Sequence, residues 1–258
     1  MTGALFAALE RALAAREPVA LATVLEGEGT GRQLLIWPGE QTLGDLGTPR
    51  LNQRAALFSE KVFADRESKR KALRAADGRV EVFFELFLPP PKLVVVGAVH
   101  VAIHLVEMAR RQGFATFVVD PRTVFATPER FAAADELIQE WPQEAFPRIG
   151  FDASTYLAVL SHDLKIDLPA LAYALRTPAR YLGALGSSRT HAKRVTALEA
   201  EGFSAEEIAR IHSPIGFDLG GRRAEEIALA VMAEIVAVRH GNRDAAAKSP
   251  PPKEGAAE

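Results

Sequence analysis

The 258-residue sequence contains no cysteine, which excludes disulfide bonds, thiolate metal ligands and a cysteine nucleophile within this chain. Its apolar runs all fall short of the roughly 20 residues that a helix needs to cross a bilayer. Residues 2–16 read as an amphipathic helix, not a signal peptide, because Glu10 and Arg11 interrupt the alanines and leucines. The net charge is only −2, so no nucleic acid and no membrane is expected as a partner. We expect a cytoplasmic protein.

What the sequence does contain is an apolar run of Leu and Val over residues 93–96, preceded by Lys92 and followed directly by Gly97. Such a run is typical of a strand buried on both faces of a parallel sheet. A helical pattern follows, and a second apolar run over 114–119 ends in Asp120. Strand, glycine turn, helix, strand and terminal acid make a βαβ unit of the nucleotide-binding kind. An acid at that place would hold a ribose hydroxyl.

The nucleotide fingerprint of this unit departs from its pattern at one position. The pattern G-x-G-x-x-G/A aligns with Gly97, Val99 and Ala102. The middle glycine normally lets the backbone approach a pyrophosphate, and the β-branched Val99 obstructs that approach. Two interpretations stay open here. One is an NAD(P) site, with Asp120 favouring NAD, and the other is a doubly wound domain with an empty or altered crevice.

The fold class that these patterns predict is α/β. We expect a C-terminal Rossmann-like, doubly wound parallel sheet, preceded by a smaller α+β domain. Three consecutive prolines at 89–91 form a stiff break and mark the boundary. The predicted division is 1–88 for the first domain, 89–92 for the linker, 93–241 for the Rossmann-like domain and 242–258 for a disordered tail.

Within the first domain, turn glycines between two apolar runs predict a hairpin of strands 19–25 and 33–37. A glycine-rich loop follows. Pro49 is expected in the first turn of a helix that runs to about Ala75, and residues 80–87 are expected to form a strand.

Within the second domain, periodicity and capping residues predict the remaining elements. Asp167 is the expected N-cap of a helix with Pro169 in its first turn, and Ser204 opens a capping box. The other expectations are a short helical or irregular segment at 127–131, strands at 155–160 and 181–186, a helix from there to about Ala200, a loop at 212–221 and a helix from Ala224 to Arg239.

Polar residues follow four of the expected strands at their carboxyl ends, where a doubly wound sheet forms its ligand crevice. They are His100, the group Asp120-Pro121-Arg122, the group Ser161-His162-Asp163-Leu164-Lys165, and Gly186-Ser187-Ser188-Arg189. The last group gives the sharpest signal, because a glycine, two hydroxyls and an arginine at a helix N-terminus can hold a phosphate. The alternative is ordinary capping, with Ser188 or Thr190 as N-cap and Arg189 solvated.

Two other chemistries fit the same residues less well. His162, Asp163 and His191 have no spacing that dictates a coordination shell, so we expect no metal. Gly186-Ser187-Ser188-Arg189 lacks the second glycine of a nucleophile elbow, which argues against serine-hydrolase chemistry.

Several of these motifs occur together, in order, in a known family. They are Gly97-Ala98-Val99-His100-Val101-Ala102, Val119-Asp120-Pro121-Arg122, Phe125 to Phe131, Ser161-His162-Asp163, Gly183 to Arg194, and Ile211-His212-Ser213-Pro214-Ile215-Gly216. The sequence resembles the xanthine dehydrogenase accessory factor family (XdhC/CoxI) over residues 92–240. The first domain resembles it more loosely, at Ala22-Thr23-Val24 and Gly44-Asp45-Leu46-Gly47.

The resemblance implies a maturation factor and chaperone, not a turnover enzyme. Family members are understood to bind molybdenum cofactor (molybdopterin), help its sulfuration and deliver it to the apoenzyme of a molybdenum hydroxylase such as xanthine or carbon monoxide dehydrogenase. A homodimer and a cysteine desulfurase as partner are also implied. The candidate cofactor-binding residues are Gly97, Ala98, His100, Asp120, Arg122, His162, Asp163, Gly186, Ser187, Ser188 and Arg189.

Two departures from the family keep alternatives open. The family has a cysteine after the glycine-rich loop of its first domain, where this chain has Arg50, and it has a glycine at the position of Val99. Any step that needs a protein thiolate is therefore excluded for this chain alone. The alternatives are an NAD(P)-dependent oxidoreductase and a non-catalytic partner of a cysteine-bearing paralogue.

Overall fold

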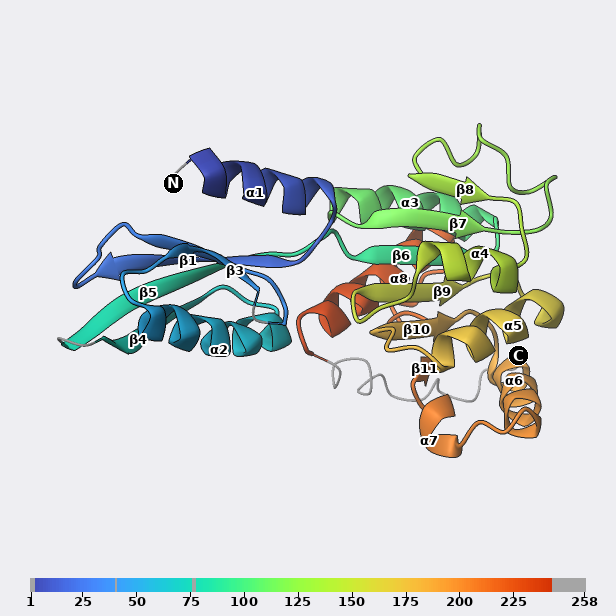
Figure 1. The fold of residues 1–258 in the computed structure, drawn as a ribbon. Coiled ribbons are helices and arrows are strands. Elements are labelled where there is room, and N and C mark those ends of the chain that lie inside the picture. Colours follow the sequence, from blue (N-terminus) through green and yellow to red (C-terminus); the bar gives the residue numbers. More distant parts are fainter. Residues whose placement is uncertain (1–2, 40, 76–77, 243–258) are drawn as a thin grey trace. The chain divides into compact units, whose positions relative to one another are not determined.

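A computed structural model describes residues 3–39, 41–75 and 78–242. Contacts within the chain divide it into two compact units, Met1–Pro89 and Pro90–Glu258 (Figure 1). The first contains an antiparallel sheet and the second a parallel one. The predicted α/β fold, with a Rossmann-like sheet in the C-terminal region, is confirmed. The disordered tail predicted for 242–258 lies almost wholly outside the described residues.

The first unit is a five-stranded antiparallel sheet with one helix on each face. Its strand order is β3-β2-β1-β5-β4. Alternate residues of a strand point to opposite faces, so Ala22 and Val24 pack with helix α2 while Val19 and Leu21 pack with helix α1. The elements are α1 (Gly3–Ala14), β1 (Val19–Glu26), β2 (Gln33–Ile36), β3 (Thr42–Asp45), α2 (Pro49–Asp65), β4 (Lys69–Ala75) and β5 (Gly78–Phe87).

Local pairing confirms one expectation in this unit and overturns another. β1 and β2 form the predicted antiparallel hairpin. The helix expected to run from Pro49 to Ala75 is wrong in its second half, because α2 ends at Asp65 and Arg66 adopts a left-handed conformation with φ 55°. Residues 69–75 instead form the edge strand β4 on β5. Their Lys, Arg and Ala residues favour a helix by propensity, but the neighbouring strand decides the outcome.

The second unit is a six-stranded parallel sheet in the order β11-β10-β9-β6-β7-β8. The chain enters at β6, proceeds to one edge through β7 and β8, then crosses to β9 and proceeds to the other edge. The switch point lies between β6 and β9, the place where such sheets bind ligands. The strands are β6 (Lys92–Val96), β7 (Ala115–Val119), β8 (Glu136–Ile138), β9 (Thr155–Val159), β10 (Tyr181–Ala184) and β11 (Ile211–His212).

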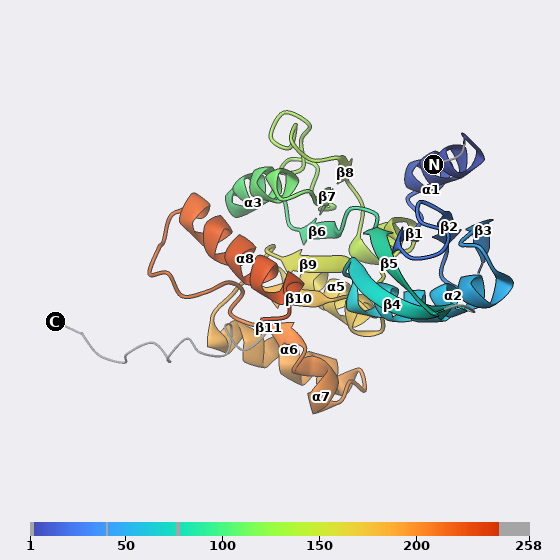
Figure 2. The same ribbon diagram turned by 90° about the vertical axis from the view of Figure 1, so that its left-hand side faces the viewer.

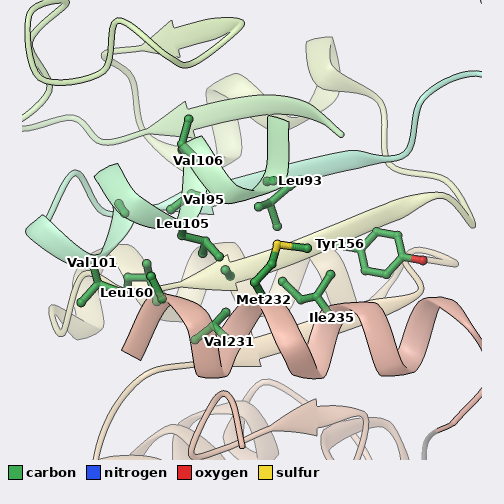
Figure 3. Close-up of a cluster of buried hydrophobic side chains, with 14 of the residues drawn as sticks. Leu93, Val95, Val101, Leu105, Val106, Tyr156, Leu160, Val231, Met232 and Ile235 are labelled. Carbon is green, nitrogen blue, oxygen red and sulfur yellow. The ribbon is translucent and has the colours of Figure 1, made fainter. Parts of the chain in front are cut away.

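Helices cover both faces of this sheet (Figure 2). α3 and α8 enclose one hydrophobic cluster, in which side chains of Leu105, Met232 and Ile235 meet Leu93 of β6 (Figure 3). α4, α5 and α6 pack on the opposite face. The helices are α3 (His100–Arg111), α4 (Pro142–Ile149), α5 (Leu164–Leu175), α6 (Ser188–Ala200), α7 (Ala205–Ile208) and α8 (Ala224–Arg239).

Three details of this unit differ from the sequence expectations. Asp163, not Asp167, is the N-cap of α5, since its side chain accepts the N–H of Lys165. Ser187, not Ser188 or Thr190, caps α6. The short elements β8, α4 and β11 were not expected. The capping box at Ser204 is confirmed.

Candidate functional site

Parallel pairing brings the expected polar loops together at the carboxyl ends of the strands in the second sheet. The four strands that precede them are neighbours in the order β10-β9-β6-β7. Backbone hydrogen bonds join their ends, from Leu160 N to Val96 O (2.7 Å) and from Leu185 N to Val159 O (2.8 Å). Gly97 and Arg189, which are 92 positions apart in the sequence, therefore both lie after strands that end on the same side of the sheet.

The turn after β6 needs its glycine for packing. Gly97 has φ 103°, which side-chain-bearing residues rarely adopt. A Cβ at this position would lie 2.7 Å from the Cα and N of Ser161, at the end of β9. Gly97 thus allows two adjacent strand ends to approach closely, and this requirement exists without any ligand.

Asp120 is fully buried and binds groups of its own chain. Its carboxylate accepts the N–H of Ala98 (2.7 Å), which belongs to the Gly97 turn. It also accepts the N–H of Arg122 (2.9 Å) and two guanidinium hydrogen bonds from the same residue, from Nε (2.9 Å) and Nη2 (2.7 Å). Burial alone would raise the pKa of Asp120, but the hydrogen bonds from Arg122 and Ala98 outweigh it and lower the pKa. Asp120 therefore occupies the backbone donor of the Gly97 turn with a carboxylate of the same chain.

The loop after β9 points its polar groups in different directions. His162 is exposed, in a left-handed conformation with φ 60°, while the half-buried Asp163 uses its carboxylate on Lys165 N (3.0 Å). The buried Ser161 hydroxyl donates to Asp167 within α5. Near this loop, Arg122 stacks on the ring of Phe125, with 4.9 Å from its Cζ to the ring centroid.

The turn after β10 exposes its polar residues. Gly186 has φ 148°, and Ser187 accepts the N–H of Thr190 (3.3 Å) to start α6. Ser188 and Arg189, the first residues of α6, are exposed. The first N–H groups of a helix have no acceptor within it, so this turn presents donors to the outside.

Behind this turn lies a buried ion pair that the sequence analysis missed. Arg194 of α6 donates through Nη2 to Asp167 of α5 and to the carbonyl of Leu185 (2.8 Å). Both side chains of the pair are 0% exposed. The available signal was the four-residue spacing of Arg194 from the buried Leu198, which places it on the inner face of the helix.

A second missed group surrounds Glu234 on α8. The 3%-exposed carboxylate accepts the hydroxyl of Tyr181 and the N–H of Gly216 (2.8 Å), and lies 3.0 Å from Nδ1 of His212. Burial raises the pKa of Glu234, but these hydrogen bonds outweigh it and lower the pKa. Burial of the Tyr181 hydroxyl, together with the charge of Glu234, raises the pKa of Tyr181 well above its ordinary value. A single glutamate in the middle of an apolar helix was the signal for this group.

The described residues bring no three His, Asp or Glu side chains together in a way that could hold a metal ion. No helix in that part of the chain has the length and apolar character to cross a membrane.

A doubly wound parallel sheet with helices on both faces and glycine turns at its strand ends defines a Rossmann-type domain. Residues 93–235, more than half of the chain, match the family described as the XdhC Rossmann domain, and the chain belongs to that family. The resemblance to xanthine dehydrogenase accessory factors is confirmed.

Three relatives show how far the similarity extends. YqeB of Escherichia coli is 26% identical over 239 residues, covering 86% of this chain and 44% of the relative. A probable xanthine dehydrogenase subunit from Bacillus subtilis is 28% identical over 163 residues, covering 63% and 47%. The molybdenum cofactor insertion chaperone PaoD of E. coli is 43% identical over 88 residues, covering 34% and 28%. The chain thus spans less than half the length of each.

A solved structure agrees with the fold. A crystal structure described as a xanthine dehydrogenase from Bacillus halodurans aligns with a TM-score of 0.55, covering 95% of this chain and 97% of that one. The sequences are 18% identical, so this similarity supports the fold alone.

Proposed function

We propose that this protein binds molybdenum cofactor and assists its maturation and insertion into a molybdenum hydroxylase of the xanthine or carbon monoxide dehydrogenase type. The similarity that carries this proposal is the 43% identity with the insertion chaperone PaoD over 88 residues. The family match over residues 93–235, most of the second unit, supports it. The Bacillus subtilis relative, named for xanthine dehydrogenase, points to the same class of client enzyme.

The chemistry of the carboxyl edge fits an anionic pterin. Molybdopterin carries a terminal phosphate and a flat, hydrogen-bonding ring. The N-terminus of α6, with exposed Ser188 and Arg189, suits the phosphate. Two exposed imidazoles are available to the ring, His100 at the start of α3 and His162 on the loop after β9. When bound, the cofactor supplies the redox-active metal, and the chain supplies binding and orientation.

Because the sequence has no cysteine, the proposal assigns cofactor binding to this chain and sulfur donation to another protein. Sulfuration of the cofactor needs a sulfur donor, and none of the 258 residues can carry a persulfide on cysteine. We therefore place the sulfur donor on another protein, a cysteine desulfurase or a cysteine-bearing paralogue. The chain itself holds cofactor for transfer to the hydroxylase apoenzyme, as a homodimer by analogy with the family.

The contacts of Asp120 argue against NAD(P) as the ligand of the Gly97 turn. A dinucleotide would need the N–H of Ala98 for its pyrophosphate and a free acid for its ribose. Asp120 is buried, and the two groups are bonded to each other. Val99 adds a β-branched side chain at the same turn. We therefore favour the cofactor chaperone over the oxidoreductase.

Co-elution tests the proposed function directly. Protein mixed anaerobically with isolated molybdenum cofactor is expected to carry it through gel filtration. Arg189→Ala should weaken binding tenfold to a hundredfold, because a charge-assisted bond to phosphate contributes about 1.5–3 kcal/mol. Arg189→Lys should recover only part of that loss, since it keeps the charge but not the planar fork.

Arg111→Ala is the matched control. Arg111 is an exposed arginine in the last turn of α3, at the end of that helix remote from the Gly97 turn, and its removal should leave binding unchanged. Absence of co-elution in every redox state of the cofactor would overturn the proposal.

A further inference from the structure

Buried polar atoms without partners gather on α6. In the described part of the chain, the unpartnered buried side-chain atoms include Nδ1 of His191 and both Nε and Nη1 of Arg194. The two residues are three positions apart, so they lie on neighbouring parts of one helix face. Native proteins pair nearly all such groups, and each exception calls for an explanation such as a bound ligand.

The guanidinium of Arg194 is held in place by one nitrogen only. Nη2 donates to Asp167 and to the carbonyl of Leu185, and Asp167 also takes the hydroxyl of Ser161. These bonds fix the plane of the guanidinium within the protein. They leave the other edge of the guanidinium, with Nε and Nη1, to be satisfied by something else.

That free edge lies against the Gly186 turn. A Cβ built on Gly186 would be 3.3 Å from Nη1 of Arg194 and 3.3 Å from Cβ of Thr190. A side chain at Gly186 would therefore crowd the buried cation, and only the bare backbone of the turn fits against Nη1. On its outer side, the same turn presents the first N–H groups of α6.

We propose that Arg194 is the inner anchor of a phosphate-monoester site at the N-terminus of α6. The phosphate sits on the N–H groups of Ser188 and Arg189, and Nη1 of Arg194 donates to it across Gly186. Asp167 is the positioning residue that holds the guanidinium in place. That the ligand is the terminal phosphate of molybdopterin rests on the proposed function, whereas the site itself does not.

His191 supports this assignment. Burial first, and the charge of Arg194 second, lower the pKa of its imidazole. The ring is therefore neutral near pH 7 and can offer Nδ1 as donor or acceptor without adding a second buried charge. Arg189 remains at the exposed rim of the site, so the two arginines approach the phosphate from opposite sides.

A charge placed on the rim tests the site without disturbing the core. Ser188→Asp puts a carboxylate at the start of α6, where the helix dipole favours it, so the fold should be retained. The same carboxylate occupies or repels the anion position. With glycerol 3-phosphate as probe, at constant ionic strength, titration calorimetry should show binding to the wild type. Ser188→Asp should bind at least tenfold more weakly than its neutral isostere Ser188→Asn.

Two further variants locate the anchor. Arg194→Lys keeps a cation but loses the planar fork, and it should weaken binding of glycerol 3-phosphate at least tenfold while circular dichroism shows an unchanged helix content. Lys193→Ala removes an exposed cation from the same helix and should have no effect. If Arg194→Lys does not fold, the Ser188→Asp and Ser188→Asn pair still decides the existence of the site.

The outcomes separate this inference from the proposed function. Binding of glycerol 3-phosphate that Ser188→Asp abolishes, without co-elution of molybdenum cofactor, supports the site and removes the proposed function. Co-elution of cofactor that is equal for Ser188→Asp, Ser188→Asn and wild type overturns the site and leaves the proposed function. Absence of any binding of glycerol 3-phosphate to the wild type also overturns it.

Discussion

The turns at Gly97 and Gly186 are built alike but differ in how their donors are used. Each follows an inner strand of the same parallel sheet, has a glycine with positive φ and leads into a helix. At the first turn, the buried carboxylate of Asp120 takes the N–H of Ala98. At the second, no acid of the described residues takes the first N–H groups of α6, and the buried Arg194 has two unpartnered nitrogens behind the turn.

The difference shows that a βαβ turn can be closed by its own chain. An acid at the end of the next strand is usually read as the sign of a ribose. Here the same acid supplies the negative charge that a pyrophosphate would bring. In the site that we propose, the anion binds instead at the Gly186 turn, behind which the buried cation Arg194 lies. Three predictions test this contrast.

The largest effect is expected from removing the acid beneath the open turn. Asp167→Ala leaves the fully buried guanidinium of Arg194 without its counter-charge, which should lower the free energy of unfolding by about 3–5 kcal/mol. Asp120→Ala should cost less, about 1–3 kcal/mol, because its partner Arg122 is 33% exposed and can be solvated. Urea unfolding followed by circular dichroism measures both.

Glu199→Ala, an exposed acid on α6, is the control for that comparison and should change little. If Asp167→Ala and Asp120→Ala lower the free energy of unfolding equally, the buried ion pair behind Gly186 contributes no more to stability than the contacts of Asp120 at the Gly97 turn.

The stability that the Asp120 carboxylate provides at the Gly97 turn should be lost in acid. The pKa of Asp120 is lowered from 3.8 in the folded state, so its contribution to stability is complete above that value and is lost as the pH falls through the folded-state pKa. The pKa of Glu234 is lowered from 4.5 in the same sense. Asp120→Asn and Glu234→Gln should each lower stability at pH 7 and flatten its decline below about pH 4.5.

Thermal unfolding between pH 3 and pH 7 measures these slopes. Glu199→Gln should keep the slope of the wild type. A variant of Asp120 with an unaltered acid slope would contradict the assignment of its charge to the Gly97 turn.

The smallest effect is expected at Val99. Val99→Gly should cost about 0.5–1 kcal/mol through the greater backbone freedom of glycine in the unfolded chain. It should not create NAD binding by itself, because Asp120 still occupies the N–H of Ala98. Calorimetric titration with NAD checks this, and the double variant with Asp120→Asn sharpens it. Measurable NAD affinity in the single variant would show that Val99 alone blocks the turn.

The parts of the fold that the sequence predicted are those with strong local patterns. The apolar runs at 93–96 and 114–119, the second broken only by Thr116, and the periodic helices around them depend little on distant residues. Residues 69–75 failed because their strand exists only through pairing with β5. The strands β8 and β11 have three and two residues, too few to show a period.

The exposed residues of the candidate site could be proposed from the sequence, whereas the buried residues behind them could not. Exposed polar residues at strand ends, such as Ser188 and Arg189, stand out by motif. Asp167 and Arg194 are 27 residues apart and lie on two different helices. The sequence of either helix alone does not indicate that the two residues pair. The closure by Asp120 was hidden for a different reason, because the same residue type at the same place would be expected to hold a ligand.

The position of α8 has a consequence for the order in which the chain folds during synthesis. α8 follows all six strands in sequence, yet it supplies Val231, Met232 and Ile235 to the core that α3 begins (Figure 3). Until residues 224–239 have left the ribosome, α3 covers this face of the parallel sheet without α8. A nascent chain halted before α8 would present that face to chaperones or to other chains. Completion of the second unit therefore waits for its last helix, although its first strand is made much earlier.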